Sequence, residues 1–411
     1  MPTATTYASA KNFIGIAPEI SQGTAVAPVA TIPVEKFEPE DKPVWLDDKA
    51  LRGSMVEQYG RQQGVIKTEF SMSGPVFGDT IGWLLSNALG DVSYTGGTNA
   101  GASTTTTGAL TAGVTAVVPV TSATGITVGT VLAIDTAGLL ELVTVLSVVS
   151  LNVTLTAPVQ RSHTSGVTVQ PVTAAFNSAF STLNSGQGQP KSHTITHYQG
   201  PVAGTGARAY PGCCFSEVSL KWNAESQLFN YDAKGLSWPS SVAGVTPTSA
   251  PSTVTPIPSW RGKLGIGGPA AGGTLVNTVA EGEVTIKREL DAVFTTQNAQ
   301  VPYIIQRGAV SIDGKLKFVA ADESPITTML NNSQPQFQLL LGNGGAGAAL
   351  VQVQVDCQAA AYETSKVDMG KTAVMYDVTF AGIANTTNAG FSGGYSPAKV
   401  TLTNAVAPQT Y

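Results

Sequence analysis

The chain has 411 residues, of which 42% are hydrophobic and only 12% are charged, and its formal net charge is −5. An acidic balance of this kind argues against tight, sequence-independent binding to nucleic acid, which needs a basic face that displaces phosphate counterions. The length allows two or three domains, and the charged share is about half of the usual quarter, as in proteins that cover much of their surface with partners.

The first 104 residues predict the beginning of a β-rich module. Residues 31–38 alternate as a strand does, residues 39–62 are the most charged stretch and predict a long loop, and residues 64–72 alternate again before Gly74-Pro75. The segment 76–89 then predicts a short helix. Its apolar residues recur at helical spacing and are expected to pack on a core: Phe77, Ile81, Leu84, Leu85 and Leu89.

Residues 105–172 change in character and predict a small inserted β-domain. Across residues 92–160 only Asp135 and Glu141 are charged, and short alternating pieces are separated by turn signals. An insertion of this kind survives where the host loop is exposed and its ends lie close together. We therefore expect the first module to consist of residues 1–104 and 173–238.

A second module is expected to repeat the first. Residues 239–258 are rich in proline, serine and threonine and predict a linker to residues 259–411. In the second module an alternating run ends at Phe318, Ser324-Pro325 precedes a short helix, and residues 291–306 form a long connection corresponding to 39–62. A Tyr-Asp pair also lies in a late strand of each half, at Tyr231-Asp232 and Tyr376-Asp377. The predicted fold class is mainly β, with two modules that each carry one short helix.

The candidates for chemistry are weak. His193 and His197 have the spacing of zinc ligands on a helix, but here they lie on a predicted strand, where the two side chains are far apart, and a third ligand is missing. The carboxylates at 38–41 and 47–48 lack an apolar pocket that would separate their pKa values. We therefore expect no enzyme activity, no metal and no cofactor.

The cysteines and the N-terminal sequence indicate the compartment in which the chain is made. Cys213, Cys214 and Cys357 form no even framework and indicate buried, reduced thiols. The N-terminus lacks a basic region followed by an apolar core, and no apolar run is long enough to span a bilayer as a helix. We expect synthesis in the cytoplasm, without a signal peptide or a membrane anchor.

Several segments together resemble one family. Residues 13–28, Phe13-Ile-Gly-Ile-Ala-Pro-Glu-Ile-Ser-Gln-Gly-Thr-Ala-Val-Ala-Pro28, resemble the opening of tailed-phage tail tube proteins, or major tail proteins. The strand-Gly-Pro-helix at 64–89, the hairpin strand at 213–222 and the run Arg307-Gly-Ala-Val-Ser-Ile-Asp-Gly look like the body of the same family. The segment 105–171 is similar to small β-domains that decorate the outside of phage tails.

The resemblance implies a β-sandwich or barrel module whose strands join across subunits into a continuous inner barrel. Rings of such modules stack into a tube that is the conduit for genome ejection. A chain with two modules resembles the duplicated tube proteins, in which three chains make a pseudo-sixfold ring, and a ring of six chains is the other possibility. The implied partners are further copies of the chain, the tape measure, tail tip and terminator proteins, and double-stranded DNA that passes without specific binding. The implied location is the virion.

By the same resemblance, the segments 39–62 and 291–306 should reach a neighbouring subunit or the adjacent ring. Aromatic residues and arginine dominate interface hot spots. The candidate anchors are therefore Trp45, Leu46, Tyr59, Arg61, Val301, Tyr303 and Arg307. The alternative is a solvated loop with local caps, but Pro43-Val-Trp-Leu46 is too apolar for a free loop.

Other functions compete with this one. A secreted or surface β-sandwich adhesin, or a glycan-binding module, suits the Thr/Ser-rich insertion but not the missing signal peptide. A β-rich polysaccharide-degrading enzyme needs paired carboxylates in an aromatic cleft, and the five tryptophans here are scattered. Another phage structural protein, such as a minor tail or neck component, is the nearest rival.

Overall fold

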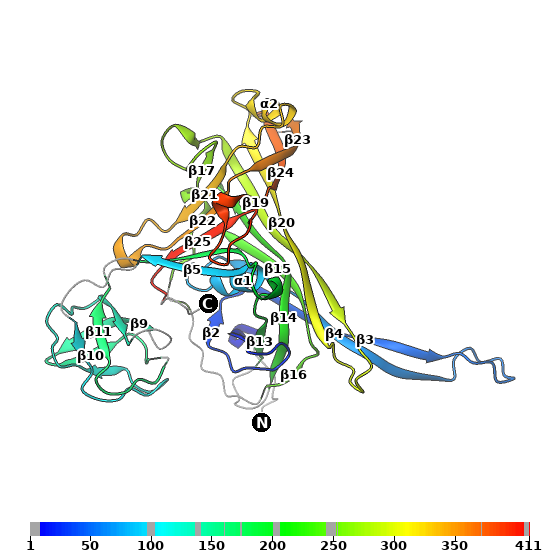
Figure 1. Ribbon diagram of the computed structural model, residues 1–411, viewed down its shortest axis with the longest axis horizontal. Coiled ribbons are helices and arrows are strands. Elements are labelled where there is room, and N and C mark those ends of the chain that lie inside the picture. The colour runs from blue at the N-terminus through cyan, green and yellow to red at the C-terminus, as the bar shows by residue number, and fades with distance from the viewer. Residues whose placement is uncertain are drawn as a thin grey trace, which may run out of the picture.

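The computed structural model describes residues 9–96, 103–135, 141–159, 161–172, 175–199, 206–243, 252, 254–370, 372–406 and 411. These residues form a mainly β protein, as predicted, with sheets of twelve, seven and six strands (Figure 1). The two larger sheets pack on each other, and the six-stranded sheet lies to one side of them (Figure 1).

The twelve-stranded sheet carries eight strands in one antiparallel row. In spatial order they are β3 (Lys36–Asp48), β4 (Gly60–Pro75), β15 (Asn230–Ser237), β14 (Ala207–Asn223), β19 (Val279–Val293), β20 (Ile304–Val319), β24 (Met375–Gly382) and β23 (Ala360–Asp368). The first four strands come from the first half of the chain and the last four from the second half. The row therefore runs from one half into the other at the β14/β19 pair.

The remaining strands of this sheet continue from the N-terminal part of β14. They are β13 (His193–Tyr198), β1 (Phe13–Pro18), β2 (Ala30–Ile32) and β16 (Ser241–Val242). The predicted strand that carries His193 and His197 is thus confirmed as β13. The predicted linker 239–258, in its described part, lies on the first half: Ile257 is fully buried, and its carbonyl accepts a hydrogen bond from the N–H of Phe229 at 2.8 Å.

The seven-stranded sheet mixes strands of both halves. Its order is β18 (Leu275–Val276), β17 (Lys263–Ile266), β21 (Phe337–Gly342), β22 (Gln352–Cys357), β25 (Lys399–Asn404), β12 (Phe176–Thr182) and β5 (Gly90–Gly96). One continuous apolar core lies between it and the twelve-stranded sheet, with Met72, Val218, Leu316 and Phe380 from the larger sheet facing Val353, Val400 and Leu402. The two halves therefore share a core, and the predicted division into separate modules stays a prediction.

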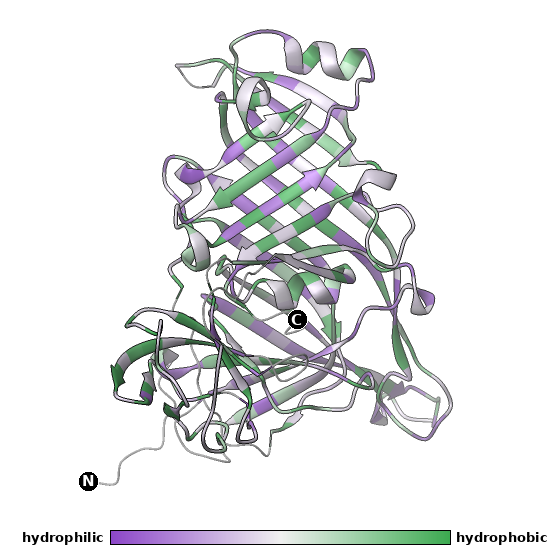
Figure 2. Cartoon of the chain, turned by 60° about the vertical axis from the view of Figure 1, so that its left-hand side comes forward, coloured by the Kyte–Doolittle hydropathy of each residue, from purple (hydrophilic) through white to green (hydrophobic). Residues whose placement is uncertain are grey.

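The eight-strand row buries one face and exposes the other. Along β4, residues 68, 70, 72 and 74 are buried, while the residues between them are more accessible. Figure 2 shows the alternation of hydrophilic and hydrophobic residues along the crossing strands. Because successive side chains of a strand point to opposite faces, the paired lysines and carboxylates of the row gather on the accessible face, whereas Arg288 and Arg307 are buried.

The two short helices differ in how they begin. α1 (Gly82–Ala88) starts later than the predicted 76–89, because Pro75 ends strand β4 and residues 78–81 form a turn. α2 (Ser324–Leu330) has Pro325 in its first turn, as predicted. Short 3₁₀ helices occupy Ser9–Lys11, Gly186–Gly188, Ser259–Arg261, Gly272–Thr274, Gly347–Ala349 and Thr386–Asn388.

The predicted long loops 39–62 and 291–306 are wrong in part, because strands extend into both of them, over 39–48 and 60–62 in the first and over 291–293 and 304–306 in the second. β3 and β4 form a hairpin whose tip is 49–59, and β19 and β20 form one whose tip is 294–303. Because the residues of β3 and β4 in the arm are charged and polar, the sequence pattern predicted a loop there instead of strands. Both faces of a strand beyond the core edge are solvated, so the apolar alternation disappears.

Two contacts between phenylalanine and glycine recur in the row with their roles exchanged. A Cβ at Gly235 would lie 2.6 Å from Cζ of Phe70 on the neighbouring strand, and a Cβ at Gly314 would lie 2.1 Å from the ring of Phe380. Glycine is therefore required at both positions, since any side chain would collide with the phenylalanine ring on the neighbouring strand.

The six-stranded sheet lies within 104–171. It contains β6 (Thr104–Thr105), β7 (Val117–Pro119), β8 (Val131–Ile134), β9 (Glu141–Val149), β10 (Asn152–Leu155) and β11 (Thr168–Pro171). A small apolar core of its own includes Leu132, Val153 and Val169. The chain leaves the seven-stranded sheet at Gly96 and returns at Phe176, and these two residues are paired neighbours on adjacent strands.

Candidate subunit interface

The β3–β4 hairpin projects from the body as an arm (Figure 1). Its tip, residues 49–59, exposes Leu51 and Met55 completely and Val56 by 55%. The polar contacts of this tip are local, such as Lys49 Nζ to Glu57 Oε1 at 3.2 Å. Apolar side chains held out in water on a hairpin are typical of a surface that a partner covers.

Four predicted anchors lie along this arm. Trp45 and Leu46 are 52% and 56% exposed on β3. The Arg61 guanidinium lies over the Trp45 ring, 5.6 Å from its centroid, and its Nε donates to Asp47 Oδ1 at 2.8 Å. This hydrogen bond lowers the pKa of the Asp47 carboxyl. The ion pair thus holds the aromatic ring in place before any partner arrives.

Tyr59, the fourth anchor, lies at the junction of tip and strand. Its N–H donates to the carbonyl of Asp48 at 2.8 Å, and the guanidinium of Arg52 lies 4.9 Å from the centre of its ring. The arm therefore carries two arginine–aromatic pairs, Trp45 with Arg61 and Tyr59 with Arg52. Their interface role stays a prediction.

The β19–β20 hairpin places the other three candidates differently. Tyr303 is 62% exposed and Val301 is half-buried, but Arg307 is only 4% exposed. Arg307 is therefore not a surface anchor. Its Nη1 donates to the Pro190 carbonyl at 2.6 Å, and its Nη2 approaches Cys214 Sγ at 3.0 Å.

Arg307 belongs to a buried basic cluster at the root of the second hairpin, which sequence reasoning missed. Arg288 on β19 donates from Nε to the Gly308 carbonyl at 2.9 Å and from Nη1 to the Ala88 carbonyl at 3.1 Å. Burial, together with the nearby charge of Arg307, lowers the pKa of Arg288 to about 10. The sequence does contain a signal for this burial. Arg307 lies two residues after Ile305, so the two side chains share the buried face of the strand.

His193 lies beside this cluster and is fully buried. Its Nδ1 is 2.8 Å from Asn87 Nδ2, so the neutral ring accepts a hydrogen bond there. Burial, and then the charges of Arg307 and Lys191, lowers the pKa of His193 to about 3. His197 lies four residues further along the same strand, edge-on to Phe37 with ring centroids 5.5 Å apart. Among the described residues no group of three or more potential metal ligands occurs.

The second hairpin lies against the base of the first arm. The carbonyl of Gln300, near its tip, accepts from the Ile66 N–H at 2.8 Å, and the Gln300 side chain donates to the Gln63 carbonyl at 2.9 Å. At the hairpin's base, Gln22 both accepts from the Ile305 N–H at 2.8 Å and donates to the Ile305 carbonyl at 3.1 Å. This hairpin is thus tied to the body at two levels.

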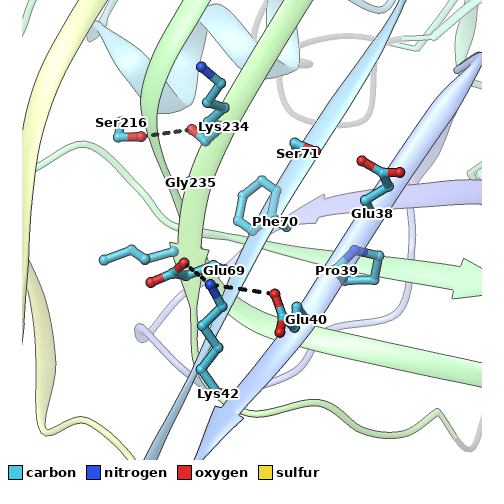
Figure 3. Close-up of a pocket in the computed structure, with 11 residues that line it drawn as sticks. Glu38, Pro39, Glu40, Lys42, Glu69, Phe70, Ser71, Ser216, Lys234 and Gly235 are labelled. Carbon is cyan, nitrogen blue, oxygen red and sulfur yellow. Dashed lines mark hydrogen bonds and ion pairs between the residues drawn. The ribbon is translucent and has the colours of Figure 1, made fainter.

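The accessible face of the eight-strand row carries both signs of charge in ion pairs. Lys42 Nζ lies 2.6 Å from Glu69 Oε2 and 3.4 Å from Glu40 Oε2, at a shallow depression lined also by Phe70 and Lys234 (Figure 3). The hydrogen bond to Glu69 raises the pKa of Lys42. The other pairs on this face include Lys221 with Asp232 and Glu283, Lys287 with Asp313, and Lys317 with Asp368 and Asp377.

The two ends of the row are edge strands, and sequence reasoning did not identify them. Within the described chain, β3 is paired only with β4, and β23 only with β24. An unpaired edge presents backbone donors and acceptors to any further strand. β23 was missed because Ala360 is its single buried residue and the run from Glu363 to Lys366 is polar.

Other observations complete the description. The three cysteines are free and buried, as predicted, and burial raises the pKa of Cys357 to about 12. Neither helix in the described part of the chain is long and apolar enough to cross a membrane.

Comparison with known proteins identifies the family. No curated protein matches the chain. A family model described as "Phage tail tube protein" matches residues 9–382, nearly the whole chain. The match takes in both halves, both hairpins and both edge strands. The chain therefore belongs to the phage tail tube protein family and is a structural protein of the virion tail.

Proposed function

We propose that this chain assembles into rings of three copies with pseudo-sixfold symmetry, and that the rings stack into the tube through which the genome leaves. One observation carries this proposal: the row of eight strands repeats one order twice and ends in two unpaired edges. A head-to-tail contact between the edges closes into a ring when the rotation per chain allows it. A ring leaves no edge exposed.

The common pattern of the two halves supports three chains rather than six. Each half supplies four strands of the row and one short helix. A ring of three chains then contains six similar halves. A ring of six chains that each carried one such half would contain the same number. A ring of six full chains would be the result if the units within one chain were not equivalent.

The charged face of the row is proposed as the inner wall. Its lysines are held by carboxylates at short range, for example Lys287 Nζ to Asp313 Oδ2 at 2.6 Å. A lysine already paired with a carboxylate gains less from a phosphate, because the first ion pair must be broken. DNA should therefore pass such a wall without sticking to it.

The exposed arm is proposed to contact a neighbouring copy or the adjacent ring. Trp45, Leu46, Tyr59 and Arg61 are then anchors, with Tyr303 and Val301 as a smaller surface on the second hairpin. The tape measure, tail tip and terminator proteins are the further partners this role requires. The family match supports this structural role over an adhesin or an enzyme.

Negative-stain electron microscopy of the purified chain at high concentration tests the proposal. We expect stacked rings with a central hole, each ring containing three chains. Rings of six full chains would overturn the stoichiometry but keep the tube. A chain that stays single at every concentration, also when phage tail tips are added as initiators, would count against assembly altogether.

A further inference from the structure

We propose that β23 of one copy pairs antiparallel with β3 of the next copy, with Lys366 opposite Glu40. This inference rests on the proposed ring and specifies its contact to the residue. The β14/β19 pair inside the chain is the template. In this pair, β14 at the end of the first half is joined to β19 at the start of the second half. We expect β23 of one copy to be joined to β3 of the next copy in the same way.

The first step equates β3–β4 with β19–β20. Both hairpins have a register shift at the same distance from the tip. A second shift in β19, between Val279 and Glu281, lies before the residues that correspond to β3. In β3 the register shifts between Pro43 and Trp45, where the partner moves from Ile66 to Gln63. The corresponding shift in the second hairpin lies between Arg288 and Leu290, where the partner moves from Val310 to Arg307. The bulges therefore align the two hairpins residue by residue.

The second step equates β14–β15 with β23–β24. Here too each pair has one bulge: between Phe215 and Glu217 in β14, and between Tyr362 and Thr364 in β23. The Tyr-Asp sequence in the partner strand fixes the alignment independently, since Leu220 faces Tyr231 and Val367 faces Tyr376. Ser219 therefore corresponds to Lys366.

The template's register can now be transferred to the free edges. In the template, Glu217, Val218, Ser219, Leu220 and Lys221 face Lys287, Ile286, Thr285, Val284 and Glu283. The corresponding pairs between copies are Thr364–Lys42, Ser365–Asp41, Lys366–Glu40, Val367–Pro39 and Asp368–Glu38. This transfer uses only the pairings and bulges of the chain itself.

The transferred register is chemically reasonable on the charged face. Lys366 meets Glu40 directly, an opposite-charge cross-strand pair. Asp368 and Glu38 would meet as like charges, but each already has its own lysine, at 3.0 Å from Lys317 and 2.8 Å from Lys36. The ammonium groups of Lys317 and Lys36 therefore offset the repulsion between the carboxylates of Asp368 and Glu38.

The opposite face gains apolar contacts. Val367 is 50% exposed and Met369, just beyond β23, is 77% exposed. The register places them opposite Pro39 and Phe37, and Phe37 already packs against the core. Pro39 has no N–H to donate, so β3 is a poor edge for indiscriminate pairing and depends on matching side chains.

The helices leave room for this contact. α1 packs on β14, and α2 packs on β23 in the same relation. Since α1 does not prevent β14 from pairing with β19, α2 need not prevent β23 from pairing with a neighbour. α1 is fully buried, whereas in α2 only Pro325 is buried, which fits a second half that still lacks its neighbour.

Disulfide trapping in the full chain tests the register. In the template, Ser219 Oγ and Thr285 Oγ1 are 2.9 Å apart, so this position brings side chains into contact. The equivalent variant, Glu40→Cys/Lys366→Cys, should form disulfides between copies in assembled tubes. On a denaturing, non-reducing gel we expect a ladder that ends at three chains. The three native cysteines are buried, and the wild-type chain is the control for them.

Two control variants bracket the result. Ser219→Cys/Thr285→Cys should form its disulfide within one chain and give no ladder. Lys36→Cys/Lys366→Cys moves one cysteine four residues along β3, about 13 Å, beyond the roughly 7 Å that a disulfide spans between Cα atoms. It should give no ladder.

The outcomes separate the two proposals. Wild-type tubes with no ladder from the Glu40 variant, or with a ladder from the Lys36 variant, would overturn the register and leave the tube standing. Absence of any wild-type assembly would overturn both. If the cysteine variant fails to assemble under reducing conditions, charge reversal decides. Lys366→Glu and Glu40→Lys should each cut tube yield at least fivefold and together restore it, and failure of the double variant to recover would overturn the pairing.

Discussion

The two hairpins of the twelve-stranded sheet share a bulge but differ in what they touch. The β19–β20 hairpin is bound to the body through Gln22 and to the first arm through Gln300. The β3–β4 arm instead projects, with Leu51 and Met55 fully exposed. In the proposed ring the two hairpins are equivalent, and the second is seen with its neighbour while the first is not. The second hairpin therefore contributes to the stability of the chain, and the first is proposed to serve assembly.

Removal of the tip of the first arm should have the largest effect on assembly. Replacing residues 50–58 with Asn-Gly, a favoured two-residue hairpin turn, should abolish tube formation and leave the folded monomer intact. The physical reason is that the tip has no partner within the body whose loss would cost stability. Electron microscopy and thermal unfolding give the two readouts. Normal tubes from the shortened chain would show that the arm is dispensable.

Trp45→Ala tests the arm at a single side chain. If Trp45 is an anchor, assembly should weaken by about 2 kcal/mol or more per contact, roughly a thirtyfold rise in the concentration needed for tubes. Trp260→Ala is the matched control, because Trp260 is also exposed and also lies beneath an arginine, Arg261 at 4.9 Å. Light scattering against concentration measures both. Equal effects from the two variants would remove the arm's special role.

Gln22→Ala tests the bound hairpin. It removes both hydrogen bonds to Ile305, a residue that is 1% exposed, and leaves a buried N–H and carbonyl with lost partners. The free energy of unfolding should fall by roughly 1–2 kcal/mol, as measured by urea denaturation. Arg61→Ala on the free arm is the comparison and should leave monomer stability within about 0.5 kcal/mol. A larger loss from Arg61→Ala would reverse the assignment of the two hairpins.

Mild acid should loosen the root of the second hairpin and spare the first arm. His193 has its pKa lowered to about 3 by burial and by Arg307, so below the unfolded value near 6.5 the unfolded state binds the extra proton. Stability is therefore full above pH 6.5 and falls as the pH drops from there, by about 1 kcal/mol between pH 7.5 and 5.5. Asp47 in the arm has its pKa lowered by Arg61, so that pair persists in this range.

Unfolding at several pH values measures this slope. His193→Gln should lose much of it, because the ring that resists protonation is gone. A variant with the wild-type slope would place the acid sensitivity elsewhere, for example at His197, whose pKa burial also lowers.

Much of the fold was predictable from the sequence, and the misses have physical causes. Strands with one buried face, such as β15 and β20, alternate and were found. The arm was predicted as a loop because β3 and β4 beyond Ile66 are solvated on both faces. β23 was missed because a strand with a single buried residue shows little apolar alternation.

The interface candidates show the same division. Trp45 and Arg61 are predicted as anchors because an aromatic ring in a charged segment needs an explanation, and both are exposed on the arm. Arg307 was misplaced because its burial depends on carbonyls at 190 and 191, far away in the chain. No local pattern reports such a contact. The register of β23 on β3 likewise needed the bulges, which only the paired strands reveal.

The paired positions of Gly96 and Phe176 have a consequence for how this protein can change over time. To the seven-stranded sheet, everything between them is the connection of one hairpin, whatever its length. Loop closure becomes only slowly more costly as a connection grows. The six-stranded sheet can therefore be exchanged, enlarged or removed while the seven-stranded sheet keeps its pairing. In the proposed tube, the same position would display a foreign domain many times along one filament.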